Sequence, residues 1–201
     1  VFIAAAAPSF KEKDRELIKW YEKEMRDLNI EVKLDTPVTD FKGLKEDEII
    51  VATGAMPRKL RIPGFEKTVE ACEYLLGQKE VGDKVVIIGG GLSGCEIALD
   101  LYLKGKTPVI VEMKNDLVAV KGVCLANTSY LRDFFELNKV EVHLESSVAE
   151  ITDDGVKIKD KDGNISEIKA DSVISSAGYI PAPVTCEGKK AKLVGDCNGV
   201  G

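Results

Sequence analysis

Three glycines and one glutamate have the residue types and the spacing needed to hold a dinucleotide. Gly89, Gly91 and Gly94 follow the pattern G-x-G-x-x-G. In this pattern the first glycine permits a tight turn, the second lets a pyrophosphate approach the backbone, and the third lets a helix pack closely on a strand. Glu112 follows Gly94 at close to the spacing of about 20 residues expected for an acid that accepts hydrogen bonds from ribose hydroxyls. Together these four residues predict a dinucleotide-binding site.

The elements that must position these residues surround them in the sequence. Residues 85–88 are a β-branched apolar run, which predicts a buried strand ending at the glycines. Apolar residues then recur at helical spacing from Leu92 to Tyr102, so the N-terminus of a helix would point its free N–H groups at the phosphates. A second apolar strand, residues 108–111, leads to Glu112. The candidate nucleotide-binding residues of this region are Gly89, Gly91, Leu92, Ser93, Gly94 and Glu112.

The remaining pattern predicts further helices and strands on both sides of this motif. Helices are expected near residues 9–29 and, after a loop containing Gly122, around a stripe formed by Leu131, Phe134, Phe135 and Asn138. A short helix that Thr68 would cap should end at Gly77. Three segments joined by glycine-containing turns predict a β-meander at residues 148–152, 156–159 and 165–169. Other strands are expected at residues 30–34, 38–41, 48–52, 140–144, 172–175 and 192–194.

Composition excludes several classes of protein. The 201 residues are 44% hydrophobic, enough for a buried core, and the net charge of −6 argues against a nucleic-acid partner. No apolar run approaches the roughly 20 residues that cross a bilayer, so no membrane partner is expected. Five cysteines without a C-x-x-C pair predict reduced thiols in a cytoplasmic protein and no metal site: Cys72, Cys95, Cys124, Cys186 and Cys197. Because the chain begins at Val1 without a methionine, we expect a piece of a longer protein.

Four motifs, taken in order, resemble flavoproteins that have two dinucleotide-binding domains. They are Ala-Thr-Gly at 52–54, the glycine-rich loop at 89–94, Ala-Gly-Tyr-Ile-Pro at 177–181 and Gly-Asp at 195–196. More narrowly, residues 10–51 and the closing Gly-Asp-Cys-Asn-Gly-Val-Gly resemble the C-terminal region of the 2-enoate reductase and 2,4-dienoyl-CoA reductase family, which is related to trimethylamine dehydrogenase. The resemblance covers nearly the whole chain.

This resemblance implies an α/β fold in two parts. A Rossmann-like NAD(P)H-binding domain with a β-meander would occupy residues 82–174. It would be inserted in a truncated FAD-binding-type α/β domain made of residues 1–81 and 175–201. The chain lacks the first glycine-rich loop of the family, the one that binds the FAD pyrophosphate, and it also lacks the paired redox cysteines of disulfide reductases.

The resemblance also assigns positions near the cofactors. Asp196 would accept hydrogen bonds from the FAD ribityl hydroxyls, and Thr53 and Gly54 would lie near the flavin nucleotide. Gly178 would lie near the nicotinamide cofactor. Glu96 would approach the nicotinamide, although an acid in the first turn of a helix is explained equally well by the helix dipole. Neither a catalytic side chain nor a metal ligand is assigned.

In such enzymes NADH reduces FAD, and electrons pass through an iron–sulfur cluster to FMN. The FMN lies in a separate N-terminal barrel domain, which would be this chain's partner and would reduce a small-molecule enoate or dienoyl substrate. We expect NADH to be preferred over NADPH, because Glu112 would repel a 2′-phosphate. The present chain alone should bind nicotinamide nucleotide weakly, retain no FAD and turn over no enoate.

Other readings of the motifs stay open at this point. The chain could belong to a different NAD(P)H-dependent flavoprotein reductase, or it could be a nucleotide-binding module that senses or docks without catalysis. A short-chain dehydrogenase is a third reading, because Tyr102 and Lys106 have Tyr-x-x-x-Lys spacing. Gly105 and Pro108, however, put that pair at the end of the first helix, far from where a substrate would meet nicotinamide.

Overall fold

The computed structural model describes residues 2–120, 122–184 and 191–200, which fall into two compact units. The first unit comprises Val1–Arg15 and Lys59–Ala177, and the second comprises Glu16–Arg58 and Gly178–Gly201. These limits differ from the domain boundaries near residues 82 and 174, which stay a prediction.

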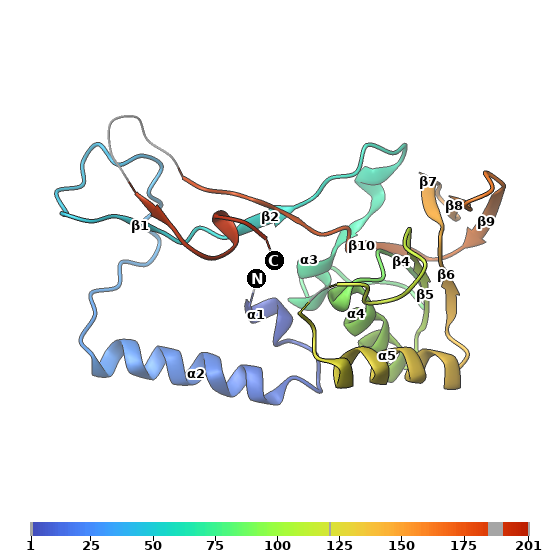
Figure 1. The fold of residues 1–201 in the computed structure, drawn as a ribbon, viewed down its shortest axis with the longest axis horizontal. Coiled ribbons are helices and arrows are strands. Elements are labelled where there is room, and N and C mark those ends of the chain that lie inside the picture. The colour runs from blue at the N-terminus through green and yellow to red at the C-terminus, as the bar shows by residue number, and fades with distance from the viewer. Residues whose placement is uncertain (1, 121, 185–190, 201) are drawn as a thin grey trace. The chain divides into compact units, whose positions relative to one another are not determined.

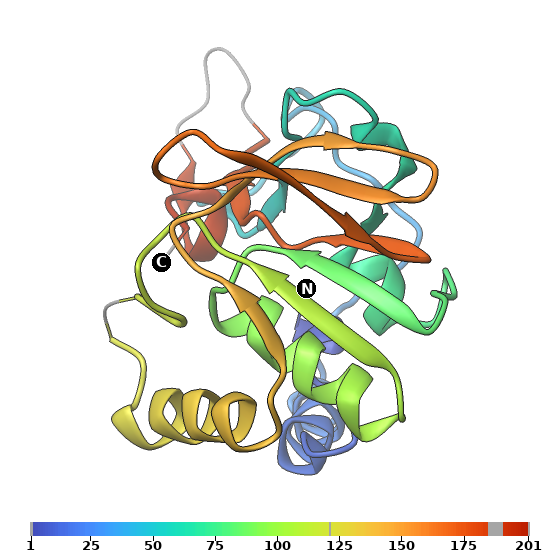
Figure 2. The ribbon, with the colours of Figure 1, turned by 90° about the vertical axis from the view of Figure 1, so that its right-hand side faces the viewer.

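The first unit is built on a parallel sheet with β4 at its centre (Figures 1 and 2). Strand β10 pairs with β4 on one side and β5 pairs with it on the other, and all these pairings are parallel. The strands, in spatial order, are β3 (Val69–Glu70), β10 (Ser172–Ser175), β4 (Lys84–Ile88), β5 (Thr107–Val111) and β6 (Glu141–His143). The carboxyl ends of β4 and β5 therefore lie side by side, and this places Glu112 beside the glycine-rich loop.

Both faces of this sheet are covered, and the two faces differ (Figure 2). Helices α4 (Leu92–Leu103) and α5 (Leu125–Leu137) pack on one face. The other face carries an antiparallel β-meander, as the sequence predicted. Its strands are β7 (Ser147–Ile151), β8 (Gly155–Lys159) and β9 (Ile165–Lys169).

The residues of β4 explain why each face of the sheet is covered by another layer. Val85 and Ile87 are fully buried among the helices, whereas Val86 and Ile88 face the hydrophobic side of the meander. Successive side chains of a strand point to opposite faces, so a continuous apolar run needs an apolar layer on each side. This packing fixes the strand that carries the glycine-rich loop.

Shorter elements complete the first unit: α1 (Phe2–Ala5), the 3₁₀ helix η1 (Phe65–Lys67) and α3 (Ala71–Leu75). The expected Thr68 cap of α3 is wrong. Glu70 is the N-cap and accepts a hydrogen bond from the Cys72 N–H at 2.7 Å, while Thr68 ends η1 instead. A glutamate can take the place of the usual short N-cap side chain here because the Glu73 carboxylate in turn accepts a hydrogen bond from the Glu70 N–H.

The second unit contains two small sheets and a single long helix in its described residues. Helix α2 (Glu12–Asp27) crosses the boundary between the units at residue 16. Strand β1 (Ile50–Val51) pairs in parallel with β12 (Lys192–Leu193), and β2 (Ala55–Pro57) pairs antiparallel with β11 (Tyr179–Pro181). The 3₁₀ helix η2 (Gly195–Cys197) follows β12.

The strands predicted at residues 30–34 and 38–41 are wrong. Neither segment is a strand, and Ile30, Val32 and Leu34 are 47%, 54% and 78% exposed. A strand needs a neighbour to satisfy its backbone groups, and no described strand pairs with these residues. Phe41 is nevertheless buried with Val51 and Cys197 in a small core.

Four cysteines are free thiols in the described part of the chain: Cys72, Cys95, Cys124 and Cys197. Cys186 lies outside the described residues. None of the helices in the described ranges combines the length and the apolar character needed to cross a membrane.

Candidate nucleotide-binding site

Two of the three motif glycines hold strand, loop and helix in close contact. Gly89 has φ of 108°, and a Cβ at this position would lie 2.4 Å from the Ser176 carbonyl oxygen. A Cβ on Gly94 would lie only 1.9 Å from the Gly89 carbonyl oxygen. Side chains cannot be accommodated at either position without moving backbone, so α4 approaches β4 as closely as a dinucleotide loop requires.

Gly91 has a different role because it faces open space. It is the N-cap of α4 with φ of −69°, a conformation open to any residue, and it makes no side-chain cap bond. A Cβ there would meet nothing within 4 Å outside its local backbone. The first-turn N–H groups of a helix, here beginning at Leu92 and Ser93, have no partner within the helix. This open, positively polarised helix end fits a pyrophosphate.

Glu112 is held rigidly at the end of β5, next to this loop. One carboxylate oxygen accepts a hydrogen bond from the Gly90 N–H at 2.6 Å, and the other accepts from the Lys114 N–H at 2.8 Å. The Glu112 N–H donates to the His143 carbonyl of the neighbouring strand at 2.8 Å. Each carboxylate oxygen keeps a further lone pair, so the residue can still accept hydrogen bonds from ribose hydroxyls.

Sequence reasoning missed Gly90, which links Glu112 to the loop. Its carbonyl oxygen accepts a hydrogen bond from the Val118 N–H at 2.7 Å, and the Cys95 thiol donates to it at 3.4 Å. A Cβ on Gly90 would lie 2.6 Å from Leu117 Cδ2. The signal was available, because three consecutive glycines exceed what the motif itself demands.

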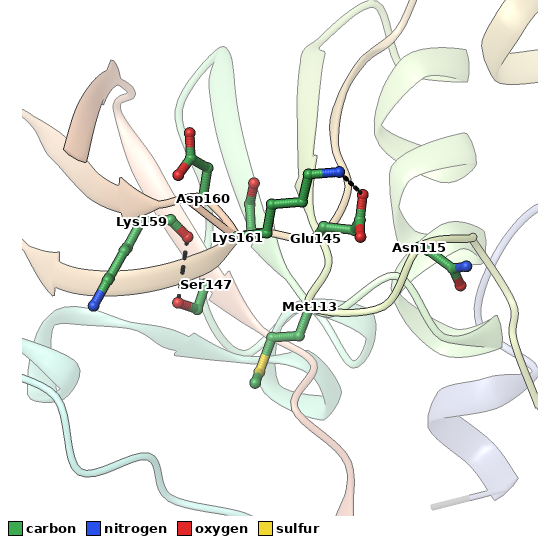
Figure 3. Close-up of a pocket in the computed structure, with 8 residues that line it drawn as sticks. Met113, Asn115, Glu145, Ser147, Lys159, Asp160 and Lys161 are labelled. Atoms are coloured by element: carbon green, nitrogen blue, oxygen red, sulfur yellow. Dashed lines mark hydrogen bonds and ion pairs between the residues drawn. The ribbon is translucent and has the colours of Figure 1, made fainter. Parts of the chain in front are cut away.

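A hollow of about 460 Å³ opens beside the Glu112 strand end (Figure 3). Met113, Ser147 and Lys159 lie along it, and Glu145 and Lys161 form an ion pair at 3.1 Å on its wall. The Ser146 N–H, at the start of this wall, donates to the Glu112 carbonyl at 2.9 Å. The backbone of Ser146, which lines the hollow, is thus bonded to the backbone of Glu112, and Met113, the residue after Glu112, also lines it.

Glu96 and the Tyr-x-x-x-Lys pair are engaged by other residues. Glu96 forms an ion pair with Lys11 at 2.5 Å, so its charge is already balanced. The Tyr102 hydroxyl donates to Asn138 Oδ1 at 3.0 Å, and the Lys106 ammonium donates to the carbonyls of Val81 and Gly82. These bonds tie Tyr102 and Lys106 into the framework at the end of α4 opposite the glycine-rich loop.

Cys95, beneath the loop, should make the chain less stable at alkaline pH. Burial raises the pKa of its thiol to about 12, and the Glu112 carboxylate adds to that rise. Between about pH 9 and 12 the unfolded chain loses this proton while the folded chain keeps it, so the free energy of unfolding falls by up to about 1.4 kcal/mol per pH unit. Cys95→Ala should flatten this slope in urea melts between pH 9 and 10.5.

Cys124→Ala is the matched control, because Cys124 is exposed and should leave the slope unchanged. The pKa of Tyr74 is also raised by burial and by Asp100. Above pH 10, Tyr74 should therefore still make the free energy of unfolding fall with pH in the Cys95→Ala variant. A Cys95→Ala variant with the parent slope would show that the thiol ionises as freely in the folded chain as in the unfolded chain.

The second unit holds the other predicted site residues. The Thr53 hydroxyl donates to the Ala182 carbonyl at 2.7 Å, and the Ala182 N–H donates to the Gly54 carbonyl at 3.1 Å. Gly178, with φ of 86°, accepts a hydrogen bond from the Arg58 N–H at 2.9 Å. Thr53, Gly54 and Gly178 thus stand at the paired strands β2 and β11, and Asp196 is exposed in η2, which contacts β11.

These residues fit only part of an FAD molecule. Asp196 offers a carboxylate, and the paired strands β2 and β11 with their flanking residues offer backbone groups. Among the described residues of the second unit, however, no helix follows a glycine-rich loop, so nothing there matches the cradle that Gly91 and α4 form for a pyrophosphate in the first unit. The described residues therefore offer a helix N-terminus for a dinucleotide pyrophosphate in the first unit and no such group in the second.

Comparisons with known proteins agree with this architecture. Residues 43–199 match the sequence profile of the family described as pyridine nucleotide-disulphide oxidoreductase. Cinnamate reductase of Clostridium sporogenes is 40% identical over 206 residues, which cover 98% of this chain and 31% of that protein. NADH oxidase of Thermoanaerobacter brockii is 30% identical over 213 residues, covering 99% of this chain and 32% of that protein.

A solved structure of 2-naphthoyl-CoA reductase with 2-naphthoyl-CoA shares the fold, with a TM-score of 0.85 at 24% identity. That match covers 99% of this chain and 31% of the other. The chain thus spans about a third of the length of the relatives it matches. The family profile and the cinnamate reductase match together confirm the resemblance drawn from the four motifs, and the chain belongs to the pyridine nucleotide-disulphide oxidoreductase family.

Proposed function

We propose that this chain is the NADH-binding part of a flavin-dependent oxidoreductase. In the whole protein it would deliver hydride from NADH to FAD. The electrons would then pass through an iron–sulfur cluster to FMN in a separate barrel domain, which reduces an enoate or dienoyl-type substrate. Membership of the family implies binding of FAD and NAD(P)H. The observation that carries the proposal is the open helix end at Gly91 with Glu112 fixed beside it.

The residues of the first unit would each hold one part of the nucleotide. The N–H groups at the start of α4 would bind the pyrophosphate, because the helix dipole and the free donors both favour an anion there. Glu112 would accept hydrogen bonds from the ribose hydroxyls of the adenosine half. The hollow beside Met113 and Ser147 would then receive the adenine. NADH supplies the hydride, and the chain supplies binding and orientation.

Glu112 should make the chain prefer NADH over NADPH. Two unit charges about 4 Å apart repel by about 4 kcal/mol at an effective dielectric constant near 20. Screening by solvent and by the Lys114 ammonium should reduce this to about 1–3 kcal/mol, a roughly ten- to hundredfold preference. Calorimetric titration of the chain with each nucleotide measures it directly.

Substitutions of Glu112 separate its charge from its hydrogen bonds. Glu112→Gln keeps an oxygen that can accept the Gly90 N–H but removes the charge, so it should narrow the preference while NADH binding falls only modestly. Glu112→Ala also leaves the Gly90 N–H without this acceptor and should weaken NADH binding further. Equal affinity of the parent chain for both nucleotides would contradict the role assigned to Glu112.

A dye-reduction assay distinguishes a reductase from a module that only binds nucleotide. NADH is added to the chain with FAD and an artificial electron acceptor, and oxidation of NADH is followed by absorbance. We expect the purified chain to be colourless, since its described residues fit FAD incompletely, and to oxidise NADH only when FAD is supplied. NADH binding with no oxidation at saturating FAD, in the full-length protein as well as in this chain, would favour the sensing or docking module instead.

A further inference from the structure

We propose that Arg132 is a positioning residue for the nucleotide, acting through the loop that follows β5. This loop, residues 113–120, is called the cover loop. It lies between Glu112 and α5 in the sequence and contacts Gly90 of the glycine-rich loop. The inference rests on the proposed function, because the position it controls is that of the groups expected to bind NADH.

The Arg132 guanidinium binds two adjacent residues of the cover loop, Asp116 and Leu117. It forms a two-pronged ion pair with Asp116, at 2.9 Å from Nε to Oδ1 and 2.7 Å from Nη2 to Oδ2. The same two nitrogens donate to the Leu117 carbonyl at 3.1 and 2.6 Å. Only the planar fork of arginine can make all four contacts, since a lysine offers a single point charge. Leu131, next to Arg132 on α5, is buried and anchors the helix that carries it.

Val118, the residue after Leu117, has a strained backbone conformation that neighbouring contacts must hold in place. Val118 has φ of 49°, in the left-handed region that β-branched residues rarely adopt, and it is 2% exposed. Strained conformations of this kind persist only where the surroundings hold them, and they gather at functional sites. In this conformation the Val118 N–H donates to the Gly90 carbonyl at 2.7 Å.

Gly90 transmits this contact to the groups that would touch the nucleotide. It lies between Gly89 and Gly91, and its N–H donates to the Glu112 carboxylate. The Leu117 side chain fills the space where a Cβ of Gly90 would be. One backbone unit is therefore held on one side by the cover loop and on the other by Glu112. Without Arg132 the strained Val118 can relax, and Gly90 then loses the partner of its carbonyl.

The effect should be moderate, because a second tie holds the cover loop. The Lys114 ammonium donates to the Ala119 carbonyl at 2.8 Å, and the Lys114 N–H donates to Glu112. We therefore expect Arg132→Met to weaken NADH binding by about five- to thirtyfold rather than abolish it. Arg132→Lys should recover only part of the loss. Asp116→Asn removes the charge of the partner while leaving the Leu117 contacts, and should give a smaller loss.

The experiment measures NADH affinity by calorimetry, together with hydrogen exchange at the backbone amides of Gly90 and Val118. The full 201-residue chain is used, and thermal unfolding checks that each variant is folded. Lys157→Met is the matched control, because it breaks an ion pair with Glu150 on the meander and should change neither reading. Arg132→Met should speed exchange at Val118, whose donor bond to Gly90 is released, and weaken NADH binding in parallel.

A purely structural role for Arg132 gives a different pattern. Arg132→Met and Asp116→Asn would then lower the unfolding temperature while NADH affinity stayed at the parent value, and the proposal would be overturned. If the parent chain itself bound no NADH, the proposed function would fail. The exchange rate at Val118 would still test the positioning step, and an unchanged rate in Arg132→Met would refute it.

Discussion

Replacing Gly94 with alanine is expected to destabilise the chain by at least about 1–3 kcal/mol and to remove measurable NADH binding. The new Cβ would lie 1.9 Å from the Gly89 carbonyl oxygen and 3.4 Å from Ile87 Cγ2. The first contact is with backbone, so no side-chain rotation relieves it. Helix α4 must therefore move away from β4, and this separates the helix N-terminus from Gly89.

Urea unfolding and NADH titration of Gly94→Ala test this expectation. The control is Gly43→Ala, since a Cβ on Gly43 meets nothing within 4 Å and should change the free energy of unfolding by less than about 0.5 kcal/mol. Parent-like stability and affinity in Gly94→Ala would show that α4 does not need to approach β4 this closely.

Replacing Gly91 with alanine should separate binding from folding. The backbone of Gly91 is in a region that alanine adopts freely, and its Cβ would meet no packed atom, so stability should be nearly unchanged. The added methyl group would occupy the space over the helix N-terminus that the pyrophosphate needs. We expect NADH affinity to fall at least about tenfold, equivalent to about 1.4 kcal/mol.

The pair of variants is more informative than either alone. Gly94→Ala should lose both stability and binding, whereas Gly91→Ala should lose binding only, although the two glycines are three residues apart in one motif. Calorimetry with NADH and thermal unfolding of both variants give the comparison. Unaltered NADH affinity in a folded Gly91→Ala chain would rule out a phosphate contact at this backbone.

The sequence predicted the sheet and the phosphate loop because local pattern determines both. The apolar run of β4 is buried on both faces, and the alternation of Val85 to Ile88 between helices and meander follows from strand geometry alone. The glycine spacing likewise reports a local backbone requirement, which the close contact between Gly94 and Gly89 explains. These features need little knowledge of distant residues.

The failures involve partners that local pattern does not reveal. Residues 30–34 alternate like a strand, but no described strand pairs with them. Glu70 replaced Thr68 as a cap because of a reciprocal bond from Glu73, which propensity alone does not indicate. The contacts of Arg132 with the cover loop were missed for the same reason. Its partners Asp116 and Leu117 precede it by 16 and 15 positions, and a strained backbone at Val118 follows them.

Backbone amide resonances of the chain, recorded during a titration with NADH, show most directly where the nucleotide binds. We expect the largest shifts at Gly89 to Gly94 and at Glu112, with smaller shifts along the hollow at Met113 and Ser147. The same shifts should be weak or absent in Gly91→Ala. Shifts confined to the meander turns at residues 153–155 and 160–164, or none at millimolar NADH, would contradict nucleotide binding at the N-terminus of α4.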